Sequence, residues 1–214
     1  MAAPSPATIR AALQRLTPCT VPAWRRLRRA WSRELNSRPA HEVIRLASAL
    51  VDGGSWGRLT AYELVACHPG GIAALTPASI RRLGRGLADW GSADTFTCYL
   101  AGPAWREGRL STREVHAWLR SWDRWQRRVA VVCTVALNVR ARGGRGDVGR
   151  TLAVCQHVVK DRDDMVVKAL SWALRSLVEW DRAAVSAFLR EHRSTLAGRV
   201  TREVRTKLRT GRKQ

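Results

Sequence analysis

A tryptophan and an aspartate lie four residues apart in the stretch LADWGSADTF (87–96), at Trp90 and Asp94. In a helix that begins near Asp89, this spacing places both side chains on one face. The chain has 17 acidic residues against 38 Lys and Arg, so a carboxylate beside an indole stands out from its basic surroundings. Because a carboxylate can stabilise positive charge or orient a water molecule, this pair is the first candidate for function.

A second stretch, WDRWQRRVAVV (122–132), places Arg127 and Arg128 at the start of an apolar helix. One of the two must point away from the core, where a guanidinium can hold a phosphate. The alternative is a solvated helix start, and it is the better interpretation for Arg127.

A third stretch, KALSWALRS (168–176), places Lys168, Trp172 and Arg175 along one helical side. Trp172 could present its ring to a ligand in a groove. The alternative is a core tryptophan flanked by cations whose aliphatic stems cover apolar surface.

Other kinds of catalytic site are not indicated by the sequence. No phosphate-binding glycine loop, HExxH word or GxSxG elbow occurs, and the five histidines are scattered. The five cysteines form no CxxC pair, which indicates reduced thiols in a cytosolic protein. We therefore expect no metal and no cofactor. The glycine-rich stretch RGGRGD (142–147) is interpreted as a flexible connector rather than a phosphate contact.

The formal charge of +21 predicts attraction to a polyanion, most simply nucleic acid. No stretch of about 18 uninterrupted apolar residues occurs, so no membrane partner is expected.

Helical periodicity dominates the chain, and strand signals are nearly absent. Breakers such as DGGS (52–55), HPGG (68–71) and AGP (101–103) recur at short intervals. The pattern predicts about twelve helices in about six antiparallel pairs, a HEAT-like all-α solenoid with a concave basic groove. The expected spans are 6–16, 22–35, 40–51, 55–67, 77–88, 91–101, 111–120, 123–139, 147–159, 163–179, 181–191 and 197–209. We expect a single domain over 1–209 and a basic tail over 210–214.

Together, the three stretches resemble the DNA alkylation repair family, the AlkD-like HEAT-repeat DNA glycosylases. That family carries words of the type SWWDxVD, WLxR and KAxGWxLR. The matching positions are Trp90 and Asp94 in the first word, Trp125 and Arg128 in the second and Trp172 in the third, with Lys168 and Arg175 keeping the flanking cations.

The resemblance covers roughly residues 20–195 and has two departures. The first word has one Trp rather than two and is followed by Gly91, and the third has Ser171 where Gly is usual. The N-terminal region looks shorter and diverged, so no site residue is carried over there.

The resemblance implies a monofunctional DNA glycosylase that excises N3- or N7-alkylated purines from duplex DNA, without a base-flipping pocket. It implies Asp94, Trp90 and Trp172 as the catalytic residues. It implies DNA contacts by Arg128, Arg127, Lys168, Arg175 and Trp125. Without a confining pocket, bulky adducts become candidate substrates, and a role in antibiotic self-resistance is compatible with this.

The expected partner is double-stranded DNA containing alkylated purines, bound by a monomer in the bacterial cytoplasm and associated with the nucleoid. The alternative is a non-catalytic binder of distorted or branched DNA on the same scaffold. A further alternative is a helical-repeat scaffold for an acidic protein.

Overall fold

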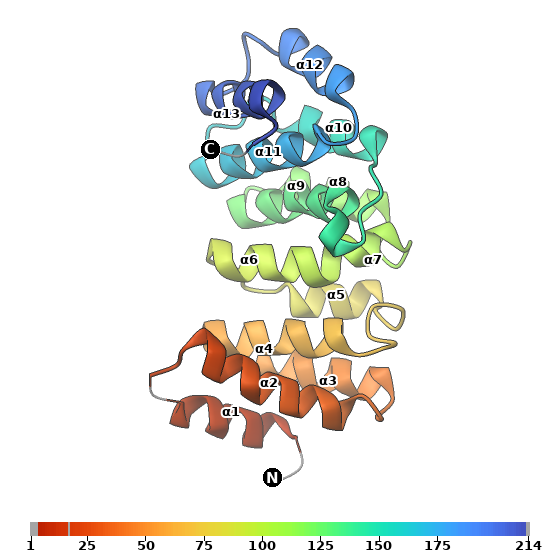
Figure 1. Cartoon of the computed structure of the whole chain (residues 1–214). Coiled ribbons are helices and arrows are strands. Elements are labelled where there is room, and N and C mark those ends of the chain that lie inside the picture. The colour runs from red at the N-terminus through yellow and green to blue at the C-terminus, as the bar shows by residue number, and fades with distance from the viewer. Residues whose placement is uncertain (1–3, 17, 213–214) are drawn as a thin grey trace. The chain divides into compact units, whose positions relative to one another are not determined.

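In the computed structural model, which describes residues 4–16 and 18–212, helices carry almost all of the regular structure (Figure 1). These residues divide into two compact units. The N-terminal unit comprises the described residues up to Gly86 together with Glu107–Leu110, and the C-terminal unit comprises Leu87–Arg106 together with the described residues from Ser111 onward. The all-α helical-repeat class is confirmed, whereas the number of pairs, the concave groove and the domain boundary at 209 stay predictions.

The helices of the N-terminal unit form a small stack in which α3 packs against α1, α4 and α5, and α2 packs against α4. Buried aromatic residues join them, because Trp24 Nε1 donates to Thr60 Oγ1 at 2.9 Å and Tyr62 Oη donates to the Leu83 carbonyl at 3.0 Å. The helices are α1 (Pro6–Arg15), α2 (Val21–Leu35), α3 (Ala40–Leu50), α4 (Gly54–Cys67) and α5 (Pro77–Leu83).

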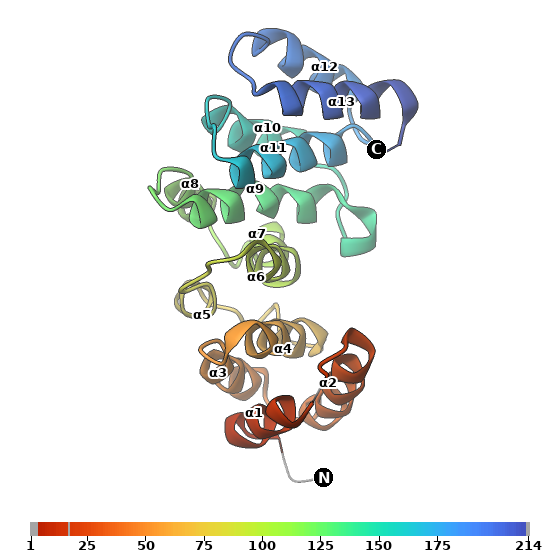
Figure 2. The same ribbon diagram turned by 90° about the vertical axis from the view of Figure 1, so that its left-hand side faces the viewer.

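The C-terminal unit repeats pairs of helices around a row of inner ones. Figures 1 and 2 both show α9 between α6 and α11, and α11 between α9 and α13. The helices are α6 (Trp90–Phe96), α7 (Gly102–Arg106), α8 (Thr112–Leu119), α9 (Arg124–Asn138), α10 (Val148–His157), α11 (Asp164–Leu177), α12 (Arg182–Glu191) and α13 (Gly198–Thr210). This row brings distant parts of the chain to one surface.

Most predicted spans agree with the structure to within two residues, but two are wrong at their C-terminal ends. The helix expected over 77–88 stops at Leu83, because Gly84 ends it and Gly86 takes a φ of 65°. The expected break at AGP does not occur. A π-helical turn over Thr97–Ala101 continues α6, and α7 follows at once with Pro103 as its second residue.

Gly102 allows α7 to lie directly on α9. A Cβ at this position would lie 2.5 Å from the Ala136 Cβ and 2.9 Å from the Thr97 carbonyl oxygen. Only glycine permits this approach, so the π-turn and α7 pack closely on the helix that carries Arg128.

The glycine-rich connector after α9 is held by hydrogen bonds. The amides of Arg145 and Gly146 both donate to the Leu137 carbonyl at 3.0 Å, and the Asp147 carboxylate caps α10 through the Arg150 amide. Gly146 has a φ of 83°, and a Cβ there would lie 2.6 Å from the Trp180 ring. The connector therefore serves the packing of the C-terminal unit.

Candidate active site

One pocket of the C-terminal unit joins its four inner helices. It encloses about 630 Å³. It is lined by Trp90 and Asp94 of α6, Arg128 of α9, Met165, Lys168, Trp172 and Arg175 of α11, and Arg199, Arg202 and Glu203 of α13. The structure thus brings together all three residues predicted as catalytic and three of the five predicted as DNA contacts.

Asp94 and Arg128 form a bidentate ion pair at this pocket. Arg128 Nε donates to Asp94 Oδ1 and Nη2 donates to Oδ2, both at 2.8 Å. The Arg128 side chain is only 6% exposed and the Asp94 side chain 18% exposed. Arg128 Nη1 also donates to the Met165 carbonyl at 2.5 Å. The pair fixes the carboxylate plane, and each carboxylate oxygen keeps a lone pair for a further donor.

The start of α6 explains why Asp94 faces this pocket. Asp89 caps the helix by accepting a hydrogen bond from the Ser92 amide at 2.8 Å. The helix therefore begins at Trp90, and Asp94 follows one turn later on the same side, as the spacing predicts.

The two indoles of the pocket differ in exposure. Trp90 is 63% exposed, whereas Trp172 is half-buried within α11. Both rings line the same cavity as the Asp94 carboxylate. Indole faces attract positive charge, so two rings and a carboxylate suit a ligand with a cationic centre.

A ladder of ion pairs joins α11 to α13 along the pocket wall. Asp164 pairs with Lys168 at 2.5 Å and with Arg199 at 3.3 Å. Arg199 Nε also donates to Glu203 Oε1 at 2.8 Å. The hydrogen bond from Lys168 is the main cause that lowers the pKa of Asp164.

Glu203 is a second carboxylate at the pocket. Its Oε2 accepts a hydrogen bond of 2.6 Å from the buried Ser171 hydroxyl, and Arg175 Nη2 lies 3.7 Å away. Burial acts to raise the pKa of Glu203, but the hydrogen bonds from Ser171 and Arg199 and the charges of Arg175 and Arg199 outweigh it and lower that pKa. Ser171, noted in the sequence as a departure, thus contacts a residue of the pocket.

Two predicted DNA contacts, Arg127 and Trp125, are not among the residues that line this pocket. Arg127 Nε donates to Asp161 Oδ2 at 2.8 Å, and its Nη1 donates to the carbonyls of Ser121 and Trp122. In the structure Arg127 thus joins two loops, and its assignment to DNA stays a prediction. Trp125 is half-buried, with the Arg124 guanidinium 5.4 Å from its ring centre.

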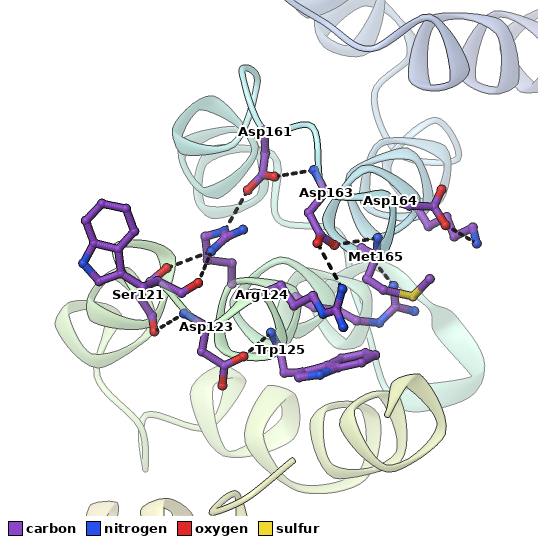
Figure 3. A network of polar contacts seen from close by, with 12 residues as sticks. Ser121, Asp123, Arg124, Trp125, Asp161, Asp163, Asp164 and Met165 are labelled. Atoms are coloured by element: carbon purple, nitrogen blue, oxygen red, sulfur yellow. Dashed lines mark hydrogen bonds and ion pairs between the residues drawn. The ribbon is translucent and has the colours of Figure 1, made fainter. Parts of the chain in front are cut away.

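The loops before α9 and α11 are fastened to each other by aspartates (Figure 3). Asp123 accepts from the Trp125 amide and Asp163 accepts from the Met165 amide, each at 2.9 Å. Asp163 also pairs with Arg124 at 3.6 Å. These caps fix the start of both helices, and so the positions from which Arg128 and Lys168 reach the pocket.

Four lining residues were not identified from the sequence, namely Met165, Arg199, Arg202 and Glu203. Glu203 carried a signal that could have been used, because it is an isolated acid in the basic stretch GRVTREVRTKLRT. The arginines of that helix carried no such signal, since α2 is equally rich in arginine.

A second group of cations lies on α2 in the N-terminal unit. Arg26, Arg29 and Arg33, together with Pro22, line a shallow depression of about 400 Å³. All three are exposed, and none has an acidic partner within the described ranges 4–16 and 18–212. The sequence analysis named no residue here.

One comparison with known proteins gives a family for this chain. The family model of the DNA alkylation repair enzymes matches residues 11–208. No curated protein and no solved structure gave a match in the corresponding searches. No helix within the described residues is long and apolar enough to cross a membrane. Because the match spans nearly the whole chain, the protein belongs to the DNA alkylation repair enzyme family.

Proposed function

We propose that the protein is a DNA glycosylase that hydrolyses the N-glycosidic bond of N3- or N7-alkylated purines in duplex DNA. Its family supports a role in the repair of alkylated DNA. The observation that carries the finer assignment is the meeting of Asp94, Trp90 and Trp172 in one pocket of the C-terminal unit.

The leaving group explains why so few catalytic groups are needed. Alkylation at N3 or N7 makes the base cationic, so it departs as a neutral molecule and requires no general acid. The remaining task is to stabilise an oxocarbenium-like sugar and to direct water to C1′. A fixed carboxylate does both.

Asp94 fills this role in our proposal. Arg128 holds both carboxylate oxygens at 2.8 Å, so the group need not reorganise when positive charge develops on the sugar. One free lone pair accepts a hydrogen bond from the attacking water, and the Asp94 carboxylate takes the proton of that water as its oxygen bonds to C1′ and the N-glycosidic bond breaks to release the neutral base. The faces of Trp90 and Trp172 flank the deoxyribose and attract its positive charge.

The experiment is direct. Purified protein is incubated with duplex DNA bearing assorted alkylated purines, and the freed bases are identified by mass spectrometry. We expect 7-methylguanine and 3-methyladenine among the products, with an abasic site left in the strand. Tight binding without base release from any substrate would instead favour a non-catalytic binder of distorted or branched DNA.

Bulky adducts form a second arm of the same experiment. The pocket is open enough to leave Trp90 63% exposed. We therefore include a duplex carrying a large N3-purine adduct of a minor-groove alkylating agent. Its release would extend the substrate class and would be compatible with a role in self-resistance.

A further inference from the structure

Arg202 of α13 differs from every other cation at the pocket. It is exposed, it lines the cavity, and it has no hydrogen-bond or ion-pair partner within the part of the chain that the structure describes. Its backbone lies in the middle of α13, which packs against α11. A guanidinium on a fixed backbone with its donors free is suited to an anion from outside the protein.

The remaining cations of the pocket are already engaged with carboxylates of the chain itself. The pairs are Arg128 with Asp94, Lys168 with Asp164, Arg175 with Glu203, and Arg199 with both Asp164 and Glu203. A phosphate that approached any of these would have to compete with an existing carboxylate. Arg202 presents no such competitor.

The fork of Arg128 is directed inward. Its Nε and Nη2 hold Asp94, its Nη1 donates to the Met165 carbonyl, and its side chain is 6% exposed. A residue in this position is well placed to orient the carboxylate. It is less accessible to a DNA phosphate than Arg202.

Glu203 gives the helix that carries Arg202 a fixed position. It is the next residue in the chain, and it accepts hydrogen bonds from the Ser171 hydroxyl of α11 and from Arg199. Because the Ser171 contact bridges two helices, the stretch of α13 at Arg202 is anchored to the wall that carries Trp172. The backbone from which the Arg202 side chain extends therefore has a fixed place relative to α11.

We propose that Arg202 binds a phosphodiester of the DNA backbone beside the modified nucleotide, and that Glu203 is the positioning residue that holds this part of α13 in place. The inference rests on the proposed function for the identity of the neighbouring nucleotide. The anion is a phosphodiester rather than a protein carboxylate because the family acts on DNA. Arg202 would fix the register of the backbone, so that the sugar lies opposite Asp94.

The test replaces single phosphates with neutral methylphosphonates. A short duplex carries a stable tetrahydrofuran abasic analogue, and each phosphate flanking it is replaced in turn. We expect one position at which the replacement weakens binding of the wild-type protein about tenfold. In Arg202→Ala, binding of the unmodified duplex is weaker by a similar factor, and replacement at that position has no further effect. Such non-additivity identifies a direct contact.

Arg205→Ala is the matched control, because Arg205 is exposed on the same helix, has no partner in the described chain and does not line the pocket. It removes the same charge. We expect its effect and that of each methylphosphonate to be additive. Additivity for Arg202→Ala at every phosphate would overturn the inference.

Glu203→Gln tests the positioning role with a readout that loss of stability alone would not move. We expect the coupling between Arg202 and its phosphate to weaken while the salt dependence of binding stays that of the wild type. Full coupling in Glu203→Gln would remove Glu203 from the proposal. These binding measurements are independent of base release. A protein that releases no base can still show the coupling between Arg202 and a phosphate, and a protein that releases bases can lack it.

Discussion

Three exposed arginines of α2 and the paired arginines of the pocket carry the same charge in opposite settings. On α2, Arg26, Arg29 and Arg33 project into solvent without an acidic partner among the described residues. At the pocket, Arg128 and Arg199 are each held by a carboxylate at 2.8 Å. Arginines of this protein thus fall into two groups, those that are open to an external anion and those that hold a carboxylate of the chain in place.

The α2 arginines suit sequence-independent attraction to phosphates, which depends on charge and on the release of counterions. The paired arginines suit the orientation of a carboxylate, because a bidentate ion pair holds the two side chains in one geometry. The formal charge of +21 thus includes arginines in both settings.

The largest effect is expected for Arg128→Met, which removes the ion pair with Asp94 in the pocket. It leaves the Asp94 carboxylate without its partner, which costs about 2–3 kcal/mol and lowers Tm by roughly 5–10 °C. Release of 7-methylguanine in single turnover should fall at least about hundredfold, because the carboxylate is no longer held in place. Thermal unfolding and base release are measured on the same preparation.

The double variant Arg128→Met with Asp94→Leu separates stability from chemistry. An apolar pair can replace a buried ion pair at little cost, so most of the lost Tm should return. Base release should stay abolished. If activity returned together with Tm, the ion pair would have only a structural role.

The next largest effect is expected when the three exposed arginines of α2 are removed. A triple variant, Arg26→Ala, Arg29→Ala and Arg33→Ala, should weaken binding to unmodified duplex roughly 10- to 100-fold at about 50 mM salt. The slope of the logarithm of the binding constant against the logarithm of the salt concentration should become less steep by up to about 3. Its base release at saturating protein should equal that of the wild type. An unchanged salt slope would show that α2 does not contact DNA.

A smaller effect is expected for the pH dependence of the stability that Glu203 contributes. The pKa of Glu203 is lowered from 4.5 in the folded protein, so its ionised form stabilises the fold. That contribution is fully present above about pH 4.5 and is lost as the pH falls through the lower folded value. The difference in unfolding free energy between wild type and Glu203→Gln should therefore shrink below pH 4.5. Urea titrations at pH 7 and pH 3.5 measure this difference. If it is the same at both pH values, the ionised form of Glu203 does not stabilise the fold.

The smallest effect is expected for Ser171→Ala, which removes the 2.6 Å hydrogen bond to Glu203 and the 3.2 Å hydrogen bond that Arg175 Nε donates to the Ser171 hydroxyl. The loss should be about 1 kcal/mol of stability, with base release reduced only a few-fold. Ser176→Ala on the same helix is the control, since its hydroxyl donates only to the Ala173 carbonyl one turn earlier. Equal losses of stability in both variants would show that the contact with Glu203 does not contribute.

The fold was accessible from the sequence because breakers and helix caps are local signals. Thr76 and Ser111 form capping boxes with the residues three positions later, and Asp147 caps α10. The continuation through Pro103 was not accessible, because it depends on a π-turn and on the contact of Gly102 with Ala136. Those are properties of packing between helices.

The candidate site was accessible in part for the same reason. Trp90 with Asp94, and Lys168 with Trp172, are neighbours on single helices, so their spacing carries the information. Arg128 was identified, but its partnership with Asp94 joins residues 34 positions apart and has no local signature. The α13 wall was missed because only the fold brings Glu203 to Ser171.

We propose Asp94 as the group that acts on the modified nucleotide. Single-turnover release of 7-methylguanine from a methylated duplex, compared between wild type and Asp94→Asn, tests it most directly. Asp52→Asn, an exposed acid of the N-terminal unit, is the matched control. We expect Asp94→Asn to bind the duplex within about threefold of wild type and to release base at least about hundredfold more slowly, with Asp52→Asn unchanged. Release by Asp94→Asn at the wild-type rate would contradict the claim.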